Sequence, residues 1–484
     1  MDKAFKGLQP EGLWKHFAAL TRIPRCSKNE AAAAAYVLAE AKRLGLKVKQ
    51  DGAGNVIVWK PASHKSKKGP AVVIQGHLDM VCEKNEGTKL DFCKDPIPVV
   101  RDGDLIKTLG TTLGADNGIG VAAGLALMEA TDVKHGPLEF LFTIDEETGL
   151  TGAFKLEQGL LKGTRLLNLD SEEEGALYIG CAGGLDTVAT KRVRQVRAKA
   201  GAKLFRLKAC GLKGGHSGLD ISQGRGNALK LIARVLLRLT REFDLELASL
   251  DGGSKRNAIP REAFALVSVN PAQVEAIGQV LAQMQADVRS ELGSADPEFT
   301  LLFEPQDALP ERVVEPGEAL ALLRFLYACP HGMLAMTPDM PGLVQTSTNL
   351  AIVETTNEIV KVSLSHRSSV ESAKKDVGAM VAAYCEMNGF LVEQSSGYPG
   401  WKPNLGSALL QTAIRVHEEE FSSRPEIKAI HAGLECGIIG ERYPGMDMIS
   451  FGPNIMGAHS PDERVSISST GNFWKFLVAL IESL

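Results

Sequence analysis

The sequence predicts an α/β domain with a central, mostly parallel sheet, interrupted by an inserted α+β domain. Up to about residue 187, short apolar strands alternate with helices, which is typical of parallel sheets covered by helices on both faces. From about residue 188 the order becomes strand, helix, two strands, helix, strand. This is the ferredoxin-like order, and a related set follows it. After Trp401 a helical pattern resumes, so we expect the first domain to continue there.

These changes of pattern divide the 484 residues into three segments. We expect residues 1–187 to form the first part of the α/β domain, residues 188–398 the insertion, and residues 399–484 the second part. A chain of this length is too long for one ordinary hydrophobic core, which also favours two domains.

The first segment opens with helix and hairpin signals. Ser27-Lys28-Asn29-Glu30 has the pattern of a capping box before an Ala-rich helix that ends near Gly45. A hairpin follows, with strands at 46–50 and 55–60, and residues 63–69 are typical of a basic surface loop. The remaining predicted elements are apolar strands at 71–75, 138–144 and 165–169 and a buried helix at 117–130.

The insertion contains two sets of alternating elements. The first set has strands at 203–209, 245–250, 263–269 and 299–303 and helices at 227–242 and 272–292. The second set has helices at 318–327 and 370–388 and strands at 347–354, 358–365 and 390–393. We therefore expect two ferredoxin-like halves in one inserted domain, followed by a helix at 407–420.

Composition argues against several classes of protein. The net charge of −4 disfavours nucleic acid as a partner, and no apolar run is long enough for a membrane span. The N-terminus lacks the basic and apolar regions of a secretory signal, so we expect a cytoplasmic location. The eight cysteines include no CxxC pair, and we expect them to be reduced thiols.

Candidate chemistry begins with Glu146 and Glu147, two adjacent carboxylates where the apolar strand 138–144 ends. On their own they fit solvated surface acids. In open α/β sheets, however, ligands gather at the carboxyl ends of the strands. Such a pair allows one carboxylate to bind a metal ion and the other to move a proton. Because neighbours in a strand point to opposite faces, the strand must stop at or just before Glu146 if both are to reach one site.

His77 and Asp79 follow the strand 71–75, and their spacing of two places both side chains on one face of an extended chain. A metal-binding histidine needs its second ring nitrogen held, which Asp79 can do for His77. The simpler interpretation is a hydrogen-bonded histidine and a turn aspartate at a strand end.

Three further residues extend this candidate metal site: Asp116 at the start of the helix 117–130, Asp170 after the strand 165–169, and His459 in a Gly-Ala-His-Ser-Pro loop. Asp116 alone would be interpreted as a helix N-cap, and a loop histidine usually has no catalytic role. Together the imidazoles and carboxylates suit a site for two ions of zinc, cobalt or manganese.

Other catalytic signatures fail. The chain has no GxxxxGK[ST] loop and no GxGxxG between a strand and a helix. The run HEEEF at 417–421 ends in phenylalanine where a zinc-binding HExxH requires histidine. The run GLECG at 433–437 has glutamate where a nucleophile elbow requires serine, so a serine hydrolase is unsupported.

Seven strings occur in one order over nearly the whole chain: GHLDMV, LGADNGIG, DEETGL, NLDSEEEG, GGHSG, HAGLECG and GAHSPDE. Together they closely resemble the aminoacyl-histidine dipeptidases, the carnosine-hydrolysing type within the co-catalytic zinc peptidase superfamily. The resemblance implies a zinc-peptidase catalytic domain, a double-sized lid domain, and a homodimer formed through that lid. It also implies two divalent metal ions, Zn²⁺ first, with Co²⁺ or Mn²⁺ as alternatives.

The resemblance further implies a division of the metal ligands. His77 and Asp170 would bind one metal ion, Glu147 and His459 would bind the other, and Asp116 would bridge the two. No ligand of the pattern is missing from this sequence.

The remaining roles also come from the resemblance. Asp79 would orient the first histidine ligand, and Glu146 would be the general base. His216 of GGHSG would reach the substrate carbonyl, in related dimers from the neighbouring subunit. Asn257 and Arg367 would bind the substrate. Without the resemblance, His216 fits a turn residue and Arg367 a solvated charge.

The expected reaction is hydrolysis of short peptides, especially Xaa-His dipeptides such as β-alanyl-histidine. Glu146 would take a proton from the attacking water and deliver it to the leaving amine. Arg367 would clamp the terminal carboxylate of the peptide. Two alternatives remain: an amidohydrolase of N-acyl amino acids that uses the same metal site, and a non-catalytic peptide-binding protein.

Overall fold

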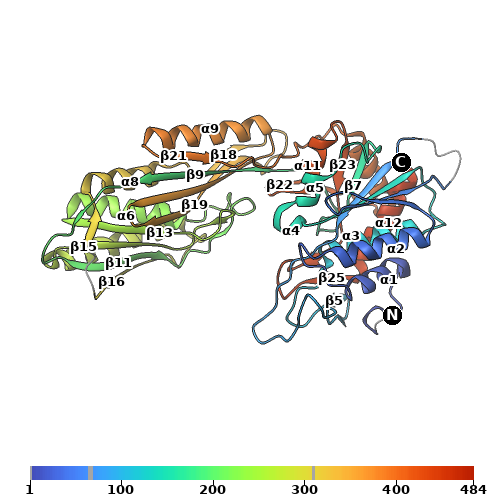
Figure 1. The fold of residues 1–484 in the computed structure, drawn as a ribbon, viewed down its shortest axis with the longest axis horizontal. Helices are drawn as coiled ribbons and strands as arrows, with labels where there is room; N and C mark the ends of the chain where they lie inside the picture. The colour runs from blue at the N-terminus through green and yellow to red at the C-terminus, as the bar shows by residue number, and fades with distance from the viewer. Residues whose placement is uncertain (1–2, 64–68, 308–310) are drawn as a thin grey trace. The chain divides into compact units, whose positions relative to one another are not determined.

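A computed structural model describes residues 3–63, 69–307 and 311–484, so most of the predicted basic loop at 63–69 lies outside the described residues (Figure 1). The chain divides into two compact units. Unit 1 comprises Met1–Gly180, Trp401–Ala429 and Leu434–Leu484, and unit 2 comprises Cys181–Gly400 and Ile430–Gly433. Unit 1 is therefore built from both ends of the chain.

Within the described residues, unit 1 has an eight-stranded sheet in the order β1-β2-β6-β3-β7-β23-β8-β22. Strands β6, β3, β7 and β23 run parallel, whereas β1 and β2 on one side and β8 on the other pair antiparallel. The predicted α/β domain with a mostly parallel centre is confirmed. The strands are β1 (Lys47–Gln50), β2 (Val56–Lys60), β3 (Val72–His77), β6 (Leu138–Thr143), β7 (Arg165–Asn168), β8 (Ala176–Cys181), β22 (Glu426–Ile430) and β23 (Asp447–Ser450).

Helices of unit 1 pack on this sheet. Helix α3 contacts β3 and α1, and α10 contacts β23 and α12; Figure 1 shows α1, α2 and α3 together. The helices are α1 (Glu11–Leu20), α2 (Ala31–Arg43), α3 (Ala115–Glu129), α4 (Glu146–Gly149), α5 (Thr151–Lys155), α10 (Ala408–Phe421), α11 (Glu435–Arg442) and α12 (Ile467–Ser483), with a 3-10 turn at Lys3–Phe5. A small separate sheet has the order β24 (Ile455–Met456), β25 (Arg464–Ser466), β5 (Leu105–Lys107), β4 (Val100–Asp102).

The glycines of helix α3 allow it to pack directly against the sheet. A Cβ at Gly120 would lie 2.5 Å from the carbonyl oxygen of Leu169, and one at Gly124 would lie 3.1 Å from the ring of Phe142. Most residues of α3 are buried. The close approach brings the start of the helix to the carboxyl end of β7.

The predicted capping box before α2 is wrong. The N-cap residue of this helix is Glu30, and its side chain makes no capping hydrogen bond. Its Oε1 instead accepts from the backbone N–H groups of Lys28 and Asp145. The hydroxyl of Ser27 donates to Asp79 Oδ2 at 2.8 Å. The polar residues of this turn therefore bind another part of the fold rather than the helix end.

The expectation that all eight cysteines are reduced thiols is also wrong. Cys26 and Cys82 form a disulfide, although 56 positions separate them in the sequence. The fold brings them together because residue 26 bridges to Met80 beside the end of β3. The pairing could not be read from spacing alone.

Unit 2 contains two ferredoxin-like halves joined in one sheet, as predicted. The strand order is β16-β11-β15-β13-β19-β20-β9-β21, and β18 pairs β19. In each half the fourth strand lies beside the first, followed by the third and the second, and the halves meet where β13 pairs β19. The first strand of the second half is β9, which precedes the whole first half in the chain. The sequence pattern did not reveal this strand.

The core of unit 2 lies between this sheet and its helices. Helices α6, α7, α8 and α9 contribute buried apolar residues to one core cluster with the strands, and Figure 1 shows α9 along the top of this unit. The helices are α6 (Ala228–Glu242), α7 (Val274–Leu292), α8 (Pro316–Ala328) and α9 (Glu371–Met387), with a 3-10 turn at Pro271–Gln273. The sheet strands are β9 (Gly183–Arg192), β11 (Lys203–Cys210), β13 (Leu245–Gly252), β15 (Ala263–Val269), β16 (Thr300–Pro305), β18 (Gly332–Met336), β19 (Val344–Thr356), β20 (Ile359–Ser368) and β21 (Leu391–Gln394). Two short pairs are β10 (Gln195–Arg197) with β17 (Arg312–Val314) and β12 (Gly215–His216) with β14 (Ala258–Ile259).

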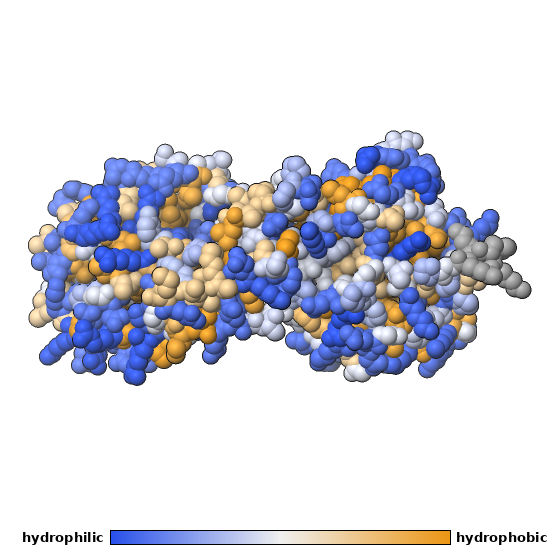
Figure 2. Space-filling model, turned by 90° about the horizontal axis from the view of Figure 1, so that it is seen from above, coloured by the Kyte–Doolittle hydropathy of each residue, from blue (hydrophilic) through white to orange (hydrophobic). Residues whose placement is uncertain are grey.

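The surface mixes hydrophilic residues with small groups of hydrophobic ones on the face shown in Figure 2. Exposed hydrophobic side chains include Met333, Leu334 and Met336 on β18. Among the described residues, no helix is both long and apolar enough to cross a membrane.

Candidate metal centre

Three adjacent parallel strands of unit 1 deliver acidic and histidine residues to one edge of the sheet. His77 is the last residue of β3, and Asp170 follows the end of β7 by two positions. Strand β6 ends at Thr143, Asp145 has a left-handed φ of 50°, and α4 begins at Glu146. The prediction that the strand stops just before Glu146 is confirmed, and this bend frees the two glutamates from the alternation of a strand.

Asp116 lies between the two histidines of the site. Its Oδ1 is 3.2 Å from His77 Nε2, and its Oδ2 is 3.1 Å from His459 Nε2. It is not a helix N-cap, because that position belongs to Gly114 and no side chain caps α3. One carboxylate therefore presents one oxygen to each histidine, which is the arrangement required of a bridging ligand.

Two groups of potential ligand atoms share Asp116. His77, Asp116 and Asp170 form one group, and Asp116, Glu147 and His459 form the other; within each group the ligand atoms lie within 4.8 Å of one another. His459 Nε2 is 3.0 Å from Glu147 Oε2, and His77 Nε2 is 3.2 Å from Asp170 Oδ1. The structure thus brings all five predicted ligands together, in the two groups that the sequence resemblance implies.

Asp79 contacts two parts of the site, the ring of His77 and the turn that carries Glu146 and Glu147. Its Oδ1 lies 3.3 Å from His77 Nδ1, on the side of the ring that faces away from the ligand group. The same carboxylate accepts hydrogen bonds from the backbone N–H groups of Glu146 and Glu147, at 3.0 and 3.2 Å. Asp79 therefore lies against the second ring nitrogen of His77 and also holds the turn that carries the two glutamates.

Glu463 is a supporting residue that the sequence did not reveal. Its carboxylate accepts the backbone N–H groups of four consecutive residues, Leu113 to Asp116, at 2.7 to 3.2 Å. It lies four residues beyond His459, so it ties the loop of one ligand to the loop of another. The acidic residue in GAHSPDE was visible in the sequence, but its partners are backbone groups, which leave no sequence signal.

Arg25 is a second unpredicted supporting residue. Its guanidinium is buried and donates to the carbonyl oxygens of Leu78, Asp79 and Gly114. It therefore joins the segment after β3 to the segment before α3.

The electrostatics of the site reflect many buried carboxylates with few cations. Burial and the neighbouring acids raise the pKa of Asp170 to about 7 and that of Glu172 to about 8. Burial, with Asp170 and Glu147 beside it, raises the pKa of Glu146 well above its ordinary value. Hydrogen bonds to Asp116 and Glu147 raise the pKa of His459 to about 11. Without added positive charge, the cluster therefore holds protons strongly.

These residues fit divalent metal ions. Glu147 Oε1 is buried and has no hydrogen-bond donor among the described residues, although a buried carboxylate oxygen normally has one. Imidazole nitrogens and carboxylate oxygens are ligands of zinc and related ions. Two divalent cations would also offset the burial and the mutual repulsion that raise the pKa values of Glu146, Asp170 and Glu172.

In unit 2, the backbone determines which nitrogen of His216 carries the proton. The N–H groups of Gly218 and Leu219 both point at His216 Nδ1, at 3.2 and 3.1 Å, so Nδ1 is the acceptor and Nε2 bears the hydrogen. Burial and the nearby Arg367 lower the pKa of His216 to about 4, which keeps the ring neutral.

Arg367 lies on β20 with its Nη2 3.4 Å from His216 Nε2. Two N–H donors thus face the same space, and neither can accept from the other. Tyr398 Oη lies 3.0 Å from Arg367 Nη1. Such a pair of donors suits an oxygen of a carbonyl or carboxylate ligand.

Asn257 is placed beside this pair through its backbone, because its carbonyl oxygen accepts from Ser217 N at 2.8 Å. Its side chain is exposed. Two further residues of unit 2 were not predicted: Tyr398, which contacts Arg367, and His431, whose Nε2 lies 2.7 Å from Ser347 Oγ. His431 is the first residue of the HAGLECG string, and this membership was the only available signal.

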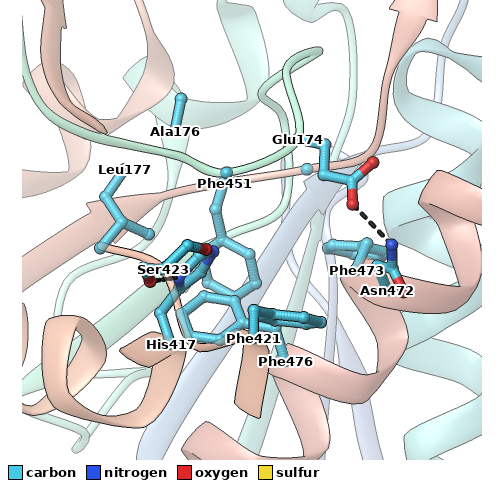
Figure 3. Close-up of a pocket in the computed structure, with 12 residues that line it drawn as sticks. Glu174, Ala176, Leu177, His417, Phe421, Ser423, Phe451, Asn472, Phe473 and Phe476 are labelled. Atoms are coloured by element: carbon cyan, nitrogen blue, oxygen red, sulfur yellow. Dashed lines mark hydrogen bonds between the residues drawn. The ribbon is translucent and has the colours of Figure 1, made fainter. Parts of the chain in front are cut away.

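A separate cavity of about 140 Å³ lies in unit 1 (Figure 3). Phe421, Phe451, Phe473 and Phe476 line it, with His417 at one side. None of the predicted site residues lines this cavity, so it is distinct from the metal centre.

Comparisons with known proteins agree with the geometry. The profile of Peptidase family M20/M25/M40 matches residues 73–483. The cytosol non-specific dipeptidase of Escherichia coli (strain K12) is 40% identical over 477 residues, which are 99% of this chain and 98% of that protein. The crystal structure of aminoacylhistidine dipeptidase from Vibrio alginolyticus has a TM-score of 0.89 at 43% identity, covering 99% of this chain and 98% of that one. Aminopeptidase PepT from Bacillus cereus ATCC 10987 has a TM-score of 0.59 at 16% identity, covering 98% of this chain and 99% of that one, and shows the fold alone.

Proposed function

Because the chain belongs to peptidase family M20/M25/M40, we propose that it is a two-metal dipeptidase acting on short peptides, especially Xaa-His dipeptides such as β-alanyl-histidine. The family resemblance predicted from the sequence motifs is confirmed by these relatives. The substrate proposal draws on the names of two of them, a non-specific dipeptidase and an aminoacylhistidine dipeptidase. The observation that carries the metal proposal is the position of Asp116, with one oxygen toward each histidine.

In this proposal, His77 and Asp170 would hold one ion, Glu147 and His459 would hold the other, and Asp116 would hold both. Divalent ions supply Lewis-acid activation of water and of the peptide carbonyl when bound. Glu146 takes the proton of the attacking water and delivers it to the leaving amine. Its position supports this role, because Glu146 lies next to the ligand Glu147 at the start of α4 and within 4.8 Å of the ligand atoms of His77 and Glu147.

The residues of unit 2 bind the peptide in this proposal. His216 donates from Nε2 to the carbonyl oxygen, where negative charge develops. Arg367 binds the terminal carboxylate, and Asn257 contacts the substrate beside them. The facing N–H groups of His216 and Arg367 support these roles, since they favour an oxygen ligand.

The proposed reaction is tested with metal-free protein prepared by chelation. Adding Zn²⁺ should restore hydrolysis of β-alanyl-histidine and of other dipeptides, and Co²⁺ and Mn²⁺ should be compared with it. N-acetyl amino acids in the same panel test the alternative amidohydrolase. Preferential hydrolysis of N-acetyl amino acids would replace the dipeptidase proposal. A protein that binds no metal and hydrolyses neither class would be a peptide-binding relative.

Two adjacent variants test the division of roles between the glutamates. Glu146→Gln should keep two metal ions per chain but lower kcat by about 10²–10⁴-fold, because it removes only the proton-transfer group. Glu147→Gln should instead lose metal, because it removes a ligand. Metal content by atomic emission and kcat at saturating metal separate the two results. Equal metal loss in both variants would contradict the assignment.

We also propose a cytoplasmic homodimer formed through unit 2. The exposed Met333, Leu334 and Met336 lie on β18, which pairs only β19 among the described strands and leaves an apolar edge. The E. coli relative is named a cytosol enzyme, which supports the location. Light scattering of the wild type and of Leu334→Lys tests the dimer. A monomeric wild type would contradict it.

A further inference from the structure

Four buried polar side chains next to the candidate metal centre form a chain of hydrogen bonds: Gln75, Thr143, Asn168 and Glu435. Glu435 Oε2 accepts from Gln75 Nε2 and from Thr143 Oγ1, both at 2.6 Å. The other end of the Gln75 amide, its Oε1, accepts from Asn168 Nδ2. All four side chains are at most 1% exposed. The proposed reaction assigns none of them a role.

The positions of these residues follow those of the ligands. Gln75 precedes His77 by two residues on β3, and Asn168 precedes Asp170 by two residues at the end of β7. Gln75 and Asn168 are also direct partners in the register of the two parallel strands. Thr143 ends β6, opposite His77 in the register. The chain of hydrogen bonds therefore links the ends of β6, β3 and β7. On each strand its members come just before the candidate ligands in the sequence.

Glu435 is the first residue of α11, and its carboxylate is the common acceptor of this network. An acidic side chain is favoured at a helix N-terminus, where the backbone N–H groups lack partners within the helix. Removing it would leave the Gln75 amide with only a 3.3 Å contact to Thr143 Oγ1 and the Thr143 hydroxyl with only a 3.4 Å contact to Gly76 O. Leaving buried donors poorly satisfied is costly, so we expect these side chains, and with them the strand ends, to shift towards other partners.

We propose that Glu435 is a positioning residue, which acts through Gln75, Thr143 and Asn168 to hold the carboxyl ends of β3, β6 and β7 where their ligands converge. This inference rests on the proposed two-metal function. Residues that orient metal ligands typically affect affinity by about 10–100-fold when removed. Glu435 contacts its partners and not the ligands themselves, so its effect is indirect.

The test compares Zn²⁺ affinity in metal-free proteins by competition with a chromophoric chelator. Glu435→Ala should weaken binding of at least one ion by about 10–100-fold. Glu435→Gln should restore most of the affinity, because its amide oxygen can accept from the same two donors. In the metal-loaded proteins, kcat should fall for Glu435→Ala with KM for a dipeptide unchanged, since Glu435 lies outside the proposed peptide contacts.

Glu139 provides a matched control at the opposite end of β6. Its carboxylate is also buried and accepts backbone N–H groups, those of Lys162 and Gly163. Glu139→Ala should lower the thermal midpoint while leaving the Zn²⁺ affinity of the folded protein unchanged. If Glu435→Ala does not fold, Gln75→Met breaks the same network at similar volume and should show the same loss of affinity.

The inference is overturned if folded Glu435→Ala binds Zn²⁺ as the wild type does, or if Glu139→Ala loses as much affinity. A wild type that binds two ions but hydrolyses no peptide would defeat the proposed function alone, and the affinity comparison would still decide the role of Glu435. A wild type that binds no divalent ion would overturn both.

Discussion

Glu463 holds the backbone around Asp116 from a position 347 residues away in the sequence: its two carboxylate oxygens accept four consecutive backbone N–H groups that end at Asp116 itself. Glu463 is 2% exposed. A single buried side chain thus fixes the loop of the proposed bridging ligand. It also joins that loop to the segment that carries His459.

Replacing Glu463 should therefore damage both stability and metal binding. Glu463→Gln puts an amide NH₂ where two backbone N–H groups now find an acceptor, and leaving both groups unsatisfied costs about 2–6 kcal/mol. We expect a lower thermal midpoint and weaker Zn²⁺ binding, measured by calorimetry and chelator competition. The neighbouring exposed Asp462 offers a control, since Asp462→Asn removes a charge at nearly the same place. Equal effects of the two variants would show that charge, rather than the hydrogen bonds, matters.

Arg367 should determine affinity for the terminal carboxylate of the peptide. Arg367→Lys removes the planar fork that binds a carboxylate with two hydrogen bonds, so KM should rise by about tenfold or more while metal content stays unchanged. A dipeptide with an amidated C-terminus lacks the carboxylate, and its hydrolysis should be nearly insensitive to the substitution. Arg256→Lys is the control, because Arg256 pairs with Asp186 on the exposed surface of the same unit. An equal loss with both substrates would contradict the carboxylate contact.

The candidate ligands could be predicted from the sequence because they follow apolar strands. Parallel strands present their carboxyl ends at one edge, so His77, Glu147 and Asp170 had to come near one another once the strands were recognised. The same pattern predicted the bend before Glu146. His459, in a loop, was recognised only through its resemblance to a family motif.

The supporting contacts could not be predicted, because most of them involve backbone atoms of distant segments. Glu463 and Arg25 bind N–H and C=O groups, which every residue possesses. Ser27 matched a capping box locally, but a buried carboxylate, Asp79, is the stronger partner for its hydroxyl. Strand β9 was missed because its partner strands come more than 150 residues later, so no local pattern reveals the pairing.

Reduction of the Cys26–Cys82 disulfide should destabilise unit 1. Closing a loop of 56 positions lowers the entropy of the unfolded chain, which corresponds to about 4 kcal/mol in the chain-entropy description. When dithiothreitol is added, the thermal midpoint of the wild type should fall to the value of the double variant Cys26→Ser/Cys82→Ser. The midpoint of the double variant should not change with dithiothreitol. Cys93→Ser, at an exposed free cysteine, should behave as the wild type. A wild-type midpoint unaffected by dithiothreitol would contradict the expectation.

His366 should make the stability of unit 2 depend on pH. It is fully buried, and its ring nitrogens lie 2.8 Å from the hydroxyl oxygens of Thr187 and Thr348. Burial lowers the pKa of His366 to about 4 in the folded chain, whereas a solvated histidine has its ordinary pKa of 6.5. Above pH 6.5 both states are neutral, so the folded state keeps its full stability. As the pH falls from 6.5 towards 4, the unfolded chain binds the proton first, and stability is lost.

The loss amounts to about 2 kcal/mol between pH 8 and pH 5 if His366 alone is counted. The metal ligands of unit 1 also titrate, so the informative quantity is the difference in stability between the wild type and His366→Gln. The glutamine side chain keeps the hydrogen-bonding capacity but does not titrate. Native-state hydrogen exchange of β20 at pH 8 and at pH 5 reports the stability of unit 2 separately. Between pH 8 and pH 5 the opening free energy of β20 in the wild type should fall by about 2 kcal/mol relative to that in the variant, because the wild type loses stability that the variant retains. A constant difference between the two proteins would mean that His366 takes up its proton equally easily in both states, and burial would then have no effect on its titration.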